Sequence, residues 1–197
     1  MSFNEAACCF DASMYTGTPD AVPCAQSLDT KSIIAGLDKL LFSGDDAAAG
    51  EYLDRWCQRA QEAGDWRTEL TLQSELMGFH RRTSDKNAAM AAVERGLELI
   101  REHRLGSTVS GATIFLNAAT TLKAYGMAER SIPMFVQTCR VYSQTLDPLD
   151  YRFGGLYNNM ALSYADIGEY DAAEGYYKKA LGVIVHCDTP ENELAVT

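Results

Sequence analysis

The sequence predicts an all-α fold built from four consecutive helix pairs. Apolar residues recur at spacings of three and four through residues 31–186, and this period places them on one face of a helix. Residues that favour turns interrupt the pattern at a regular interval. The predicted turns within the four pairs fall at Gly44, Ser84, Gly126 and Gly168. These turns are 40, 42 and 42 residues apart, so the helix pair is a repeating unit.

Composition and charge restrict the class of protein. The chain has 197 residues, of which 47% are hydrophobic and 22% charged, so one sizeable folded domain is expected. No secretion signal and no run of about 20 apolar residues is present, so we expect a cytoplasmic protein without a membrane partner. The net charge of −10 repels a phosphate backbone, so no nucleic-acid partner is expected.

Sequence motifs for catalysis, cofactors or metals are absent. Six cysteines occur without a C-x-x-C pair, and three histidines are widely separated, so free thiols and no metal site are predicted. The chain has no P-loop, no dinucleotide-binding glycine motif, no H-E-x-x-H and no G-x-S-x-G. We therefore expect no enzyme, no catalytic residue and no cofactor.

The first half of the chain contains a leader and two helix pairs. Residues 1–30, with Gly17, Pro19 and Pro23, are predicted to be a loosely structured leader or an N-terminal cap. A short helix at residues 6–14 that covers the first pair and a disordered end both remain open. The pairs are placed at residues 31–64 and 65–106, where aspartates suited to helix capping precede the apolar stretches.

Two further pairs are placed at residues 107–146 and 147–188. In the third pair, Pro133 either kinks the second helix or lies in its first turn behind a Ser131 cap, and the kink is preferred. For the fourth pair, Asp147 is expected to cap a helix that begins at Pro148. Residues 189–197 are interpreted as the start of a further repeat or as a tail. A second copy of the chain or another partner could cover an uncapped terminal repeat, and this makes a homo-oligomer a candidate state.

Residues 157–184 show the repeat most clearly. Large and small residues alternate there on two helical faces around a central glycine. The positions are Tyr157, Ala161, Tyr164, Gly168, Tyr170, Ala173, Tyr177 and Ala180. This pattern resembles the tetratricopeptide repeat (TPR). The 42-residue period exceeds the usual period of about 34, and Asn158-Asn159 is similar to the Asn-Asn of long-period repeats in kinesin light chain and related bacterial TPR proteins.

The resemblance implies a right-handed α-solenoid in which the first helix of each pair lines a concave groove. Residues at groove positions that could bind a peptide are Arg81, Arg82, Asn117, Lys123, Asn158 and Asn159. Asparagine amides can bond a peptide backbone, and the cations attract carboxylates. Solvated surface positions that complement helix ends are the alternative for the same residues.

The function expected from this resemblance is a non-enzymatic scaffold that binds a protein or peptide segment in the groove. A regulatory or sensor module of a larger bacterial signalling protein is an alternative. An enzyme with an unrecognised site is a further alternative, although no sequence motif supports it.

Overall fold

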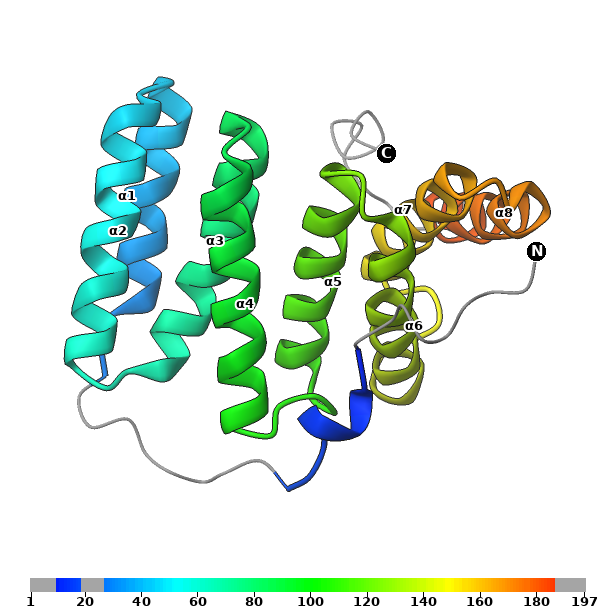
Figure 1. Ribbon diagram of the computed structural model, residues 1–197, viewed down its shortest axis with the longest axis horizontal. Helices are drawn as coiled ribbons and strands as arrows, with labels where there is room; N and C mark the ends of the chain where they lie inside the picture. The colour runs from blue at the N-terminus through cyan, green and yellow to red at the C-terminus, as the bar shows by residue number, and fades with distance from the viewer. Residues whose placement is uncertain (1–9, 19–26, 187–197) are drawn as a thin grey trace. The chain divides into compact units, whose positions relative to one another are not determined.

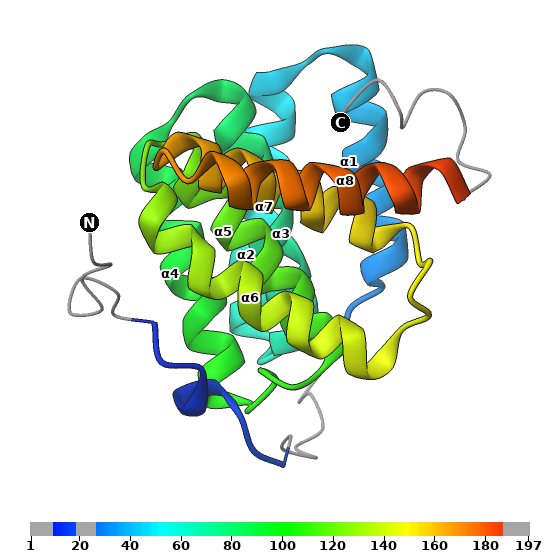
Figure 2. The same cartoon turned by 90° about the vertical axis from the view of Figure 1, so that its right-hand side faces the viewer.

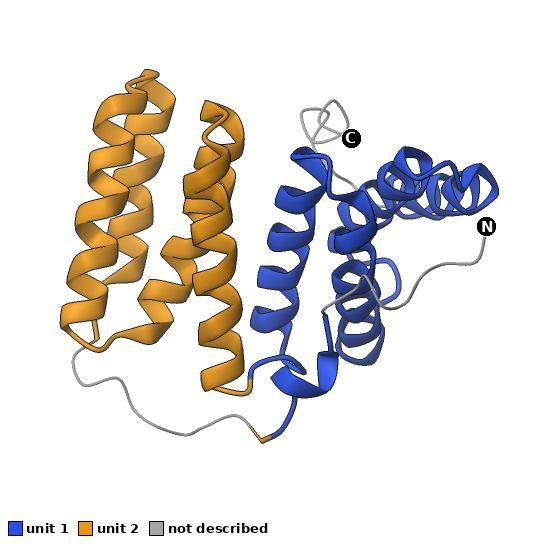
Figure 3. Ribbon diagram, in the orientation of Figure 1, with its two compact units in different colours: residues 1–17, 105–197 blue, residues 18–104 orange. Residues whose placement is uncertain are grey.

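The computed structural model describes residues 10–18 and 27–186, and these residues contain eight α-helices and no β-strand (Figure 1). They form two compact units, which are coloured separately in Figure 3. Unit 2 covers residues 18–104 and contains α1 (Thr30–Ser43), α2 (Asp46–Glu62), α3 (Trp66–Thr83) and α4 (Lys86–Glu102). Within it, α2 packs on α1, α3 on α2, and α4 on α3.

Unit 1 combines the N-terminal residues with the second half of the chain. It contains the 3-10 helix η2 (Ala12–Tyr15), followed by α5 (Val109–Ala124), α6 (Ala128–Thr145), α7 (Arg152–Asp166) and α8 (Tyr170–His186). Consecutive helices pack on one another, and α5 also contacts α7 (Figure 2). The predicted all-α fold of four helix pairs is confirmed.

The turns inside the four pairs share one backbone conformation. Gly44, Ser84, Gly126 and Gly168 have φ values of 75°, 61°, 78° and 82°. This left-handed conformation ends a helix by turning the chain back, and glycine adopts it with the least steric cost. In unit 2, Asp45 and Asp85 follow two of these turns, and Asp65 follows Gly64 between the first two pairs. The side chain of each aspartate accepts a hydrogen bond from a backbone N–H group in the next helix. Local sequence therefore determines where these helices begin and end.

Pro133 lies inside α6 and not in its first turn. The helix already begins at Ala128 with Met127 as N-cap, so the alternative in which Ser131 caps the helix is wrong. The buried Ser131 hydroxyl instead donates to the Ala128 carbonyl at 2.7 Å and lies 3.0 Å from the Ser163 hydroxyl of α7. Ser131 thus connects α6 to α7 within unit 1.

The start predicted for the seventh helix is also wrong. α7 begins at Arg152, four residues after Pro148. The Asp147 side chain accepts a hydrogen bond from the Leu149 N–H at 2.8 Å and closes a local turn instead of capping a helix. Asp150 then accepts from the Arg152 N–H at 3.0 Å, at the actual start of α7.

Residues 10–17 lie against α5 in unit 1. The Phe10 and Tyr15 rings stack on each other and meet the Phe115 ring edge-on, with centroid distances of 5.2 and 5.4 Å to Phe115. The Gly106 N–H donates to the Tyr15 carbonyl at 2.8 Å. The hypothesis that this segment covers the first pair is therefore wrong for the described residues. The remainder of the predicted 6–14 helix, residues 6–9, and the tail at 189–197 lie outside them.

No helix among residues 10–18 and 27–186 combines the length and the apolar content needed to cross a membrane.

Candidate functional site

The six residues predicted to bind a peptide lie on the first helices of three pairs, and they divide between the two units. Arg81 and Arg82 belong to α3 of unit 2. The other four belong to unit 1: Asn117 and Lys123 to α5, and Asn158 and Asn159 to α7. Because the six residues divide between two compact units, we consider one candidate surface in each unit.

In unit 1, α5 leaves only one row of side chains accessible along its central part. Between Gly111 and Leu122, every residue is buried except Thr113, Leu116, Asn117 and Thr120, which are half-buried. Lys123 follows at the same helical spacing and is also half-buried. The amide of Asn117 and the ammonium of Lys123 therefore belong to the accessible side of an otherwise buried helix.

The neighbouring helix α7 carries a similar row. Gly155, Asn158, Asn159 and Leu162 are half-buried there. The Asn159 amide donates to the Gly155 carbonyl at 3.0 Å, which fixes the side-chain orientation. Asn158 makes no side-chain hydrogen bond to any residue that the structure describes. We call the two half-buried rows of α5 and α7, including Lys123, the first-helix surface of unit 1.

Lys123 lines a hollow of about 710 Å³ beside this surface. The hollow lies between the turn that joins α5 to α6 and the C-terminal end of α7, and its charged lining residues are Lys123, Glu129, Arg130 and Asp166. Within residues 10–18 and 27–186, no carboxylate lies within 4.0 Å of the Lys123 ammonium. The charge of Lys123 is consequently available to an anionic group.

In unit 2, Arg82 is already ion-paired. Its Nη1 lies 2.6 Å from Oδ1 of Asp46 on α2, and both side chains are 47% exposed. The guanidinium also lies 5.5 Å from the Phe79 ring centroid. Arg81 is half-buried and has an interaction partner of its own. A ligand of these arginines would compete with existing contacts, so this surface is less prepared for an anion than the Lys123 end of unit 1.

Two carboxylates, Glu75 of α3 and Asp38 of α1, also lie close enough in unit 2 to repel each other. The pKa of Glu75 is raised, chiefly because burial disfavours its charge and secondarily because Asp38 on α1 repels it. A carboxylate of this kind repels further negative charge.

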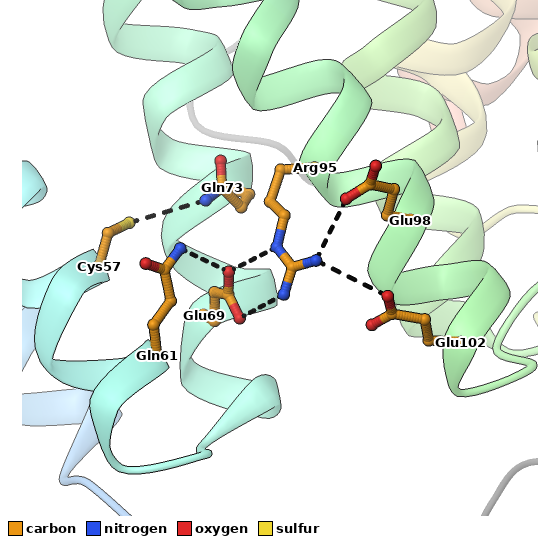
Figure 4. A network of polar contacts seen from close by, with 7 residues as sticks. All are labelled: Cys57, Gln61, Glu69, Gln73, Arg95, Glu98 and Glu102. Carbon is orange, nitrogen blue, oxygen red and sulfur yellow. Dashed lines mark hydrogen bonds and ion pairs between the residues drawn. The ribbon is translucent and has the colours of Figure 1, made fainter.

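A polar network connects α2, α3 and α4 in unit 2 (Figure 4). The buried Glu69 carboxylate accepts hydrogen bonds from Arg95 Nε at 2.7 Å, Arg95 Nη2 at 3.1 Å and Gln61 Nε2 at 2.9 Å. On its other side, Arg95 Nη1 contacts Glu98 at 3.2 Å and Glu102 at 3.8 Å. Hydrogen bonding to Glu69 raises the pKa of Arg95. Within the network, the buried Glu69 carboxylate is paired with Arg95, so the network serves packing.

Cys57 lies beside this network as a free thiol. Burial, followed by the negative charges of Glu69 and Asp54, raises its pKa to about 12. The thiol is consequently protonated at neutral pH, and a protonated thiol is a poor nucleophile and metal ligand. Among the described residues, no group of three His, Cys, Asp or Glu side chains is arranged to hold a metal ion.

Sequence reasoning missed a second hollow in unit 1, of about 570 Å³. We call it the α6 hollow. Its apolar lining comes from residues 10–18, α6 and the turn after α7, and consists of Phe10, Ala12, Ile132, Pro133, Val136 and Ile167. Arg140 and Glu169 are its charged residues. In the sequence, Val136 is one more apolar residue of an amphipathic helix, and its exposure is visible only in the structure.

Comparison with known proteins supports the fold. No protein family model matches the sequence, and no curated protein matches it either. Among solved structures, BtubC (BKLC) from P. vanneervenii is similar, with a TM-score of 0.69 and 22% sequence identity. The similarity covers 78% of this chain and 61% of that one, so the chain spans about three fifths of the protein that it matches. The chain thus has the fold of a TPR-like helical repeat.

Proposed function

We propose that this chain is a non-enzymatic scaffold that binds an extended segment of a partner protein on the first-helix surface of unit 1. One observation carries the proposal. Asn117 on α5 and Asn159 on α7 are 42 residues apart, occupy equivalent positions in successive pairs, and are both half-buried on helices that contact each other. Repeated amides at the repeat spacing are suited to a ligand that itself repeats, such as a polypeptide backbone.

The chemistry of this surface favours an acidic segment. Each asparagine amide can donate to a carbonyl and accept from an N–H group, and Asn158 has this capacity unused within the described residues. Lys123 supplies a positive charge at one end of the surface and has no carboxylate within 4.0 Å among the described residues, although Glu129 and Asp166 line the same hollow with Arg130. A carboxylate on the partner would therefore be held next to Lys123 while the asparagines bond the backbone.

We further infer that the chain is of the long-period TPR type, similar to kinesin light chain repeats. The spacings of 40, 42 and 42 residues and the adjacent Asn158 and Asn159 support this assignment. Helical repeats of this kind commonly bind other proteins on extended surfaces. The structural similarity to BtubC (BKLC) concerns the fold, and the partner of the present chain is a separate question.

The test compares capture by the wild-type chain with capture by an Asn117→Ala/Asn159→Ala variant. The biotinylated protein is incubated with a lysate of its host, and captured proteins are quantified by mass spectrometry. Loss of two hydrogen-bonding amides, each worth about 1 kcal/mol, should weaken the affinity for the true partner about 30-fold. Asn87→Ala, at an exposed asparagine of α4, is the matched control and should leave capture unchanged.

Two further variants locate the surface. Lys123→Glu should reduce capture of the same partner if an acidic residue of the partner binds at the end of α5. Arg81→Ala/Arg82→Ala should have little effect on capture because those arginines belong to unit 2. Thermal unfolding of each variant confirms that it is folded. Undiminished capture by the asparagine double variant would contradict the proposal, as would a loss caused only by the arginine variant.

A further inference from the structure

The α6 hollow is a second concave surface of unit 1, separate from the first-helix surface. Ile132, Val136 and Arg140 follow each other at four-residue spacing on α6, so one side of this helix lines the hollow. Phe10 and Ile167 close the apolar walls. Its volume of about 570 Å³ lies within the range of ligand sites in proteins.

The walls of the hollow are held by contacts that do not involve a ligand. Phe10 stacks on Tyr15 at 5.3 Å and meets Phe115 at 5.2 Å. Gln137, which also lines the hollow, is buried, and its amide donates to the Gly106 carbonyl at 3.0 Å. A ligand would therefore meet a largely preformed surface and would not have to order it first.

The charges at this hollow are asymmetric. Arg140 is exposed and lacks a carboxylate partner in the described part of the chain, although the net charge of the protein is −10. Glu169 lies at the hollow as an exposed carboxylate on the turn that precedes α8. An occupant with one negative charge gains from Arg140 and is repelled by Glu169, so the two residues also favour one orientation.

We propose that the α6 hollow binds a peptide segment that inserts one large apolar side chain against Val136 and Ile132 and places an adjacent Asp or Glu at Arg140. The positive charge of Arg140 favours an acidic residue in the peptide, and the apolar walls favour a large apolar residue beside it. Val136 remains 47% exposed, so the hollow is open to solvent at α6 and accessible to a polypeptide segment. A small apolar acid would leave much of its own surface in water here, whereas small-ligand sites bury most of theirs.

The proposal is tested by selection from random peptides displayed on phage, with the full chain as bait. The wild-type protein should enrich peptides in which a large apolar residue stands within three positions of an Asp or Glu. A synthetic peptide from the enriched set is then labelled with a fluorophore, and its Kd is measured by fluorescence polarisation against each variant.

Two substitutions at the hollow give distinct expectations. Val136→Glu places a charge in the apolar wall and should raise Kd at least about tenfold. Arg140→Glu should raise Kd similarly, and a new selection against this variant should enrich Lys or Arg in place of the acidic residue. Both side chains are exposed, so neither substitution should unfold the chain, which thermal unfolding confirms.

Two control variants separate this surface from others. Arg101→Glu changes an exposed arginine of α4 and should leave both Kd and the selected motif unchanged. Asn117→Ala/Asn159→Ala should also leave the Kd of this peptide unchanged. The proposals for the α6 hollow and for the first-helix surface can therefore be tested independently. The proposal would be overturned if no peptide were selected or if the selected peptides showed no acidic preference. It would also be overturned if Arg140→Glu left Kd unchanged, or if only the asparagine variant raised Kd.

Discussion

The Arg95 guanidinium on α4 meets the Glu69 carboxylate on α3 side-on, with Nε–Oε1 at 2.7 Å and Nη2–Oε2 at 3.1 Å. Such a paired arrangement is stronger and more directional than a single contact. Glu69 is 4% exposed and Arg95 33% exposed, so the pair lies at the edge of the core of unit 2. This ion pair joins α3 to α4 within the second helix pair, and the hydrogen bond from Gln61 to Glu69 extends the contact to α2.

Removal of Arg95 should destabilise the chain strongly. Arg95→Met leaves the buried Glu69 carboxylate with only Gln61 as its side-chain partner, and an uncompensated buried charge costs about 3 kcal/mol. Urea unfolding followed by circular dichroism measures the change in the free energy of unfolding. Glu98→Gln is the matched control, because Glu98 is 50% exposed and its contact with Arg95 should contribute less than about 1 kcal/mol. Equal costs for the two variants would contradict this assignment.

Ser84 occupies the turn position that glycine fills in the other three pairs. Its φ of 61° costs an L-residue about 1 kcal/mol. Replacement by glycine removes this strain, but part of the gain is lost because glycine gives the unfolded chain more conformational freedom. Ser84→Gly should therefore stabilise the protein by about 0.5 kcal/mol and raise Tm. Gly126→Ser, at a φ of 78°, is the reverse substitution and should lower Tm. A decrease in Tm for Ser84→Gly would show that the serine side chain makes a contact that outweighs backbone strain.

These turns explain how much of the fold the sequence could predict. The left-handed turn residue acts within a few residues, and at Gly44 and Ser84 an aspartate cap follows it directly. The register of the pairs was therefore accessible from Gly44, Ser84 and Gly126. The same local reasoning failed at Asp147, because an Asp-Pro pair suits a tight turn as well as a helix start, and the hydrogen bond to Leu149 decides between them.

The candidate sites depended more on contacts between distant residues. The half-buried row that contains Asn117 and Lys123 follows from helical phase, so its positions could be chosen from the sequence. The pairing of Arg82 with Asp46 joins residues 36 positions apart, and the α6 hollow requires Phe10 beside α6. Helical periodicity does not encode such contacts, and residues 10–18 carry no repeat signal that would place them on α5.

Glu75 gives a stability effect that depends on pH. Its pKa in the folded chain is raised from 4.5 by burial and by Asp38, so folding favours the protonated form. The associated stability is present below pH 4.5 and is lost as pH rises through the folded pKa. At pH 7 the charged Glu75 therefore destabilises the protein, and Glu75→Gln should raise Tm at pH 7 but by less at pH 4.

The control for this effect is an exposed glutamate of the same unit. Glu51→Gln, on α2, should change Tm by a small and similar amount at both pH values. Asp38→Asn should reduce the advantage of Glu75→Gln at pH 7, because it removes the repulsive partner. A Glu75→Gln variant less stable than the wild type at pH 7 would contradict the predicted sign.

The outer side of α8 carries a row of exposed apolar side chains, and it leads to a prediction about self-association. Tyr170, Tyr177, Leu181 and Val185 are 71%, 40%, 62% and 70% exposed. They recur at spacings of seven, four and four, so they share one side of the helix. An apolar surface at the end of a helical repeat is usually covered by another repeat, a cap or a partner.

If a second copy of the chain covers this side of α8, sedimentation velocity should show a dimer that forms as the protein concentration rises. Leu181→Glu places a charge in the centre of the row and should shift the protein to a monomer without loss of helical content. Leu149→Glu is the matched control, since Leu149 is 50% exposed but precedes α7, and it should leave the dimer intact. A wild-type chain that stays monomeric at every concentration would instead favour coverage by a further repeat or a different partner.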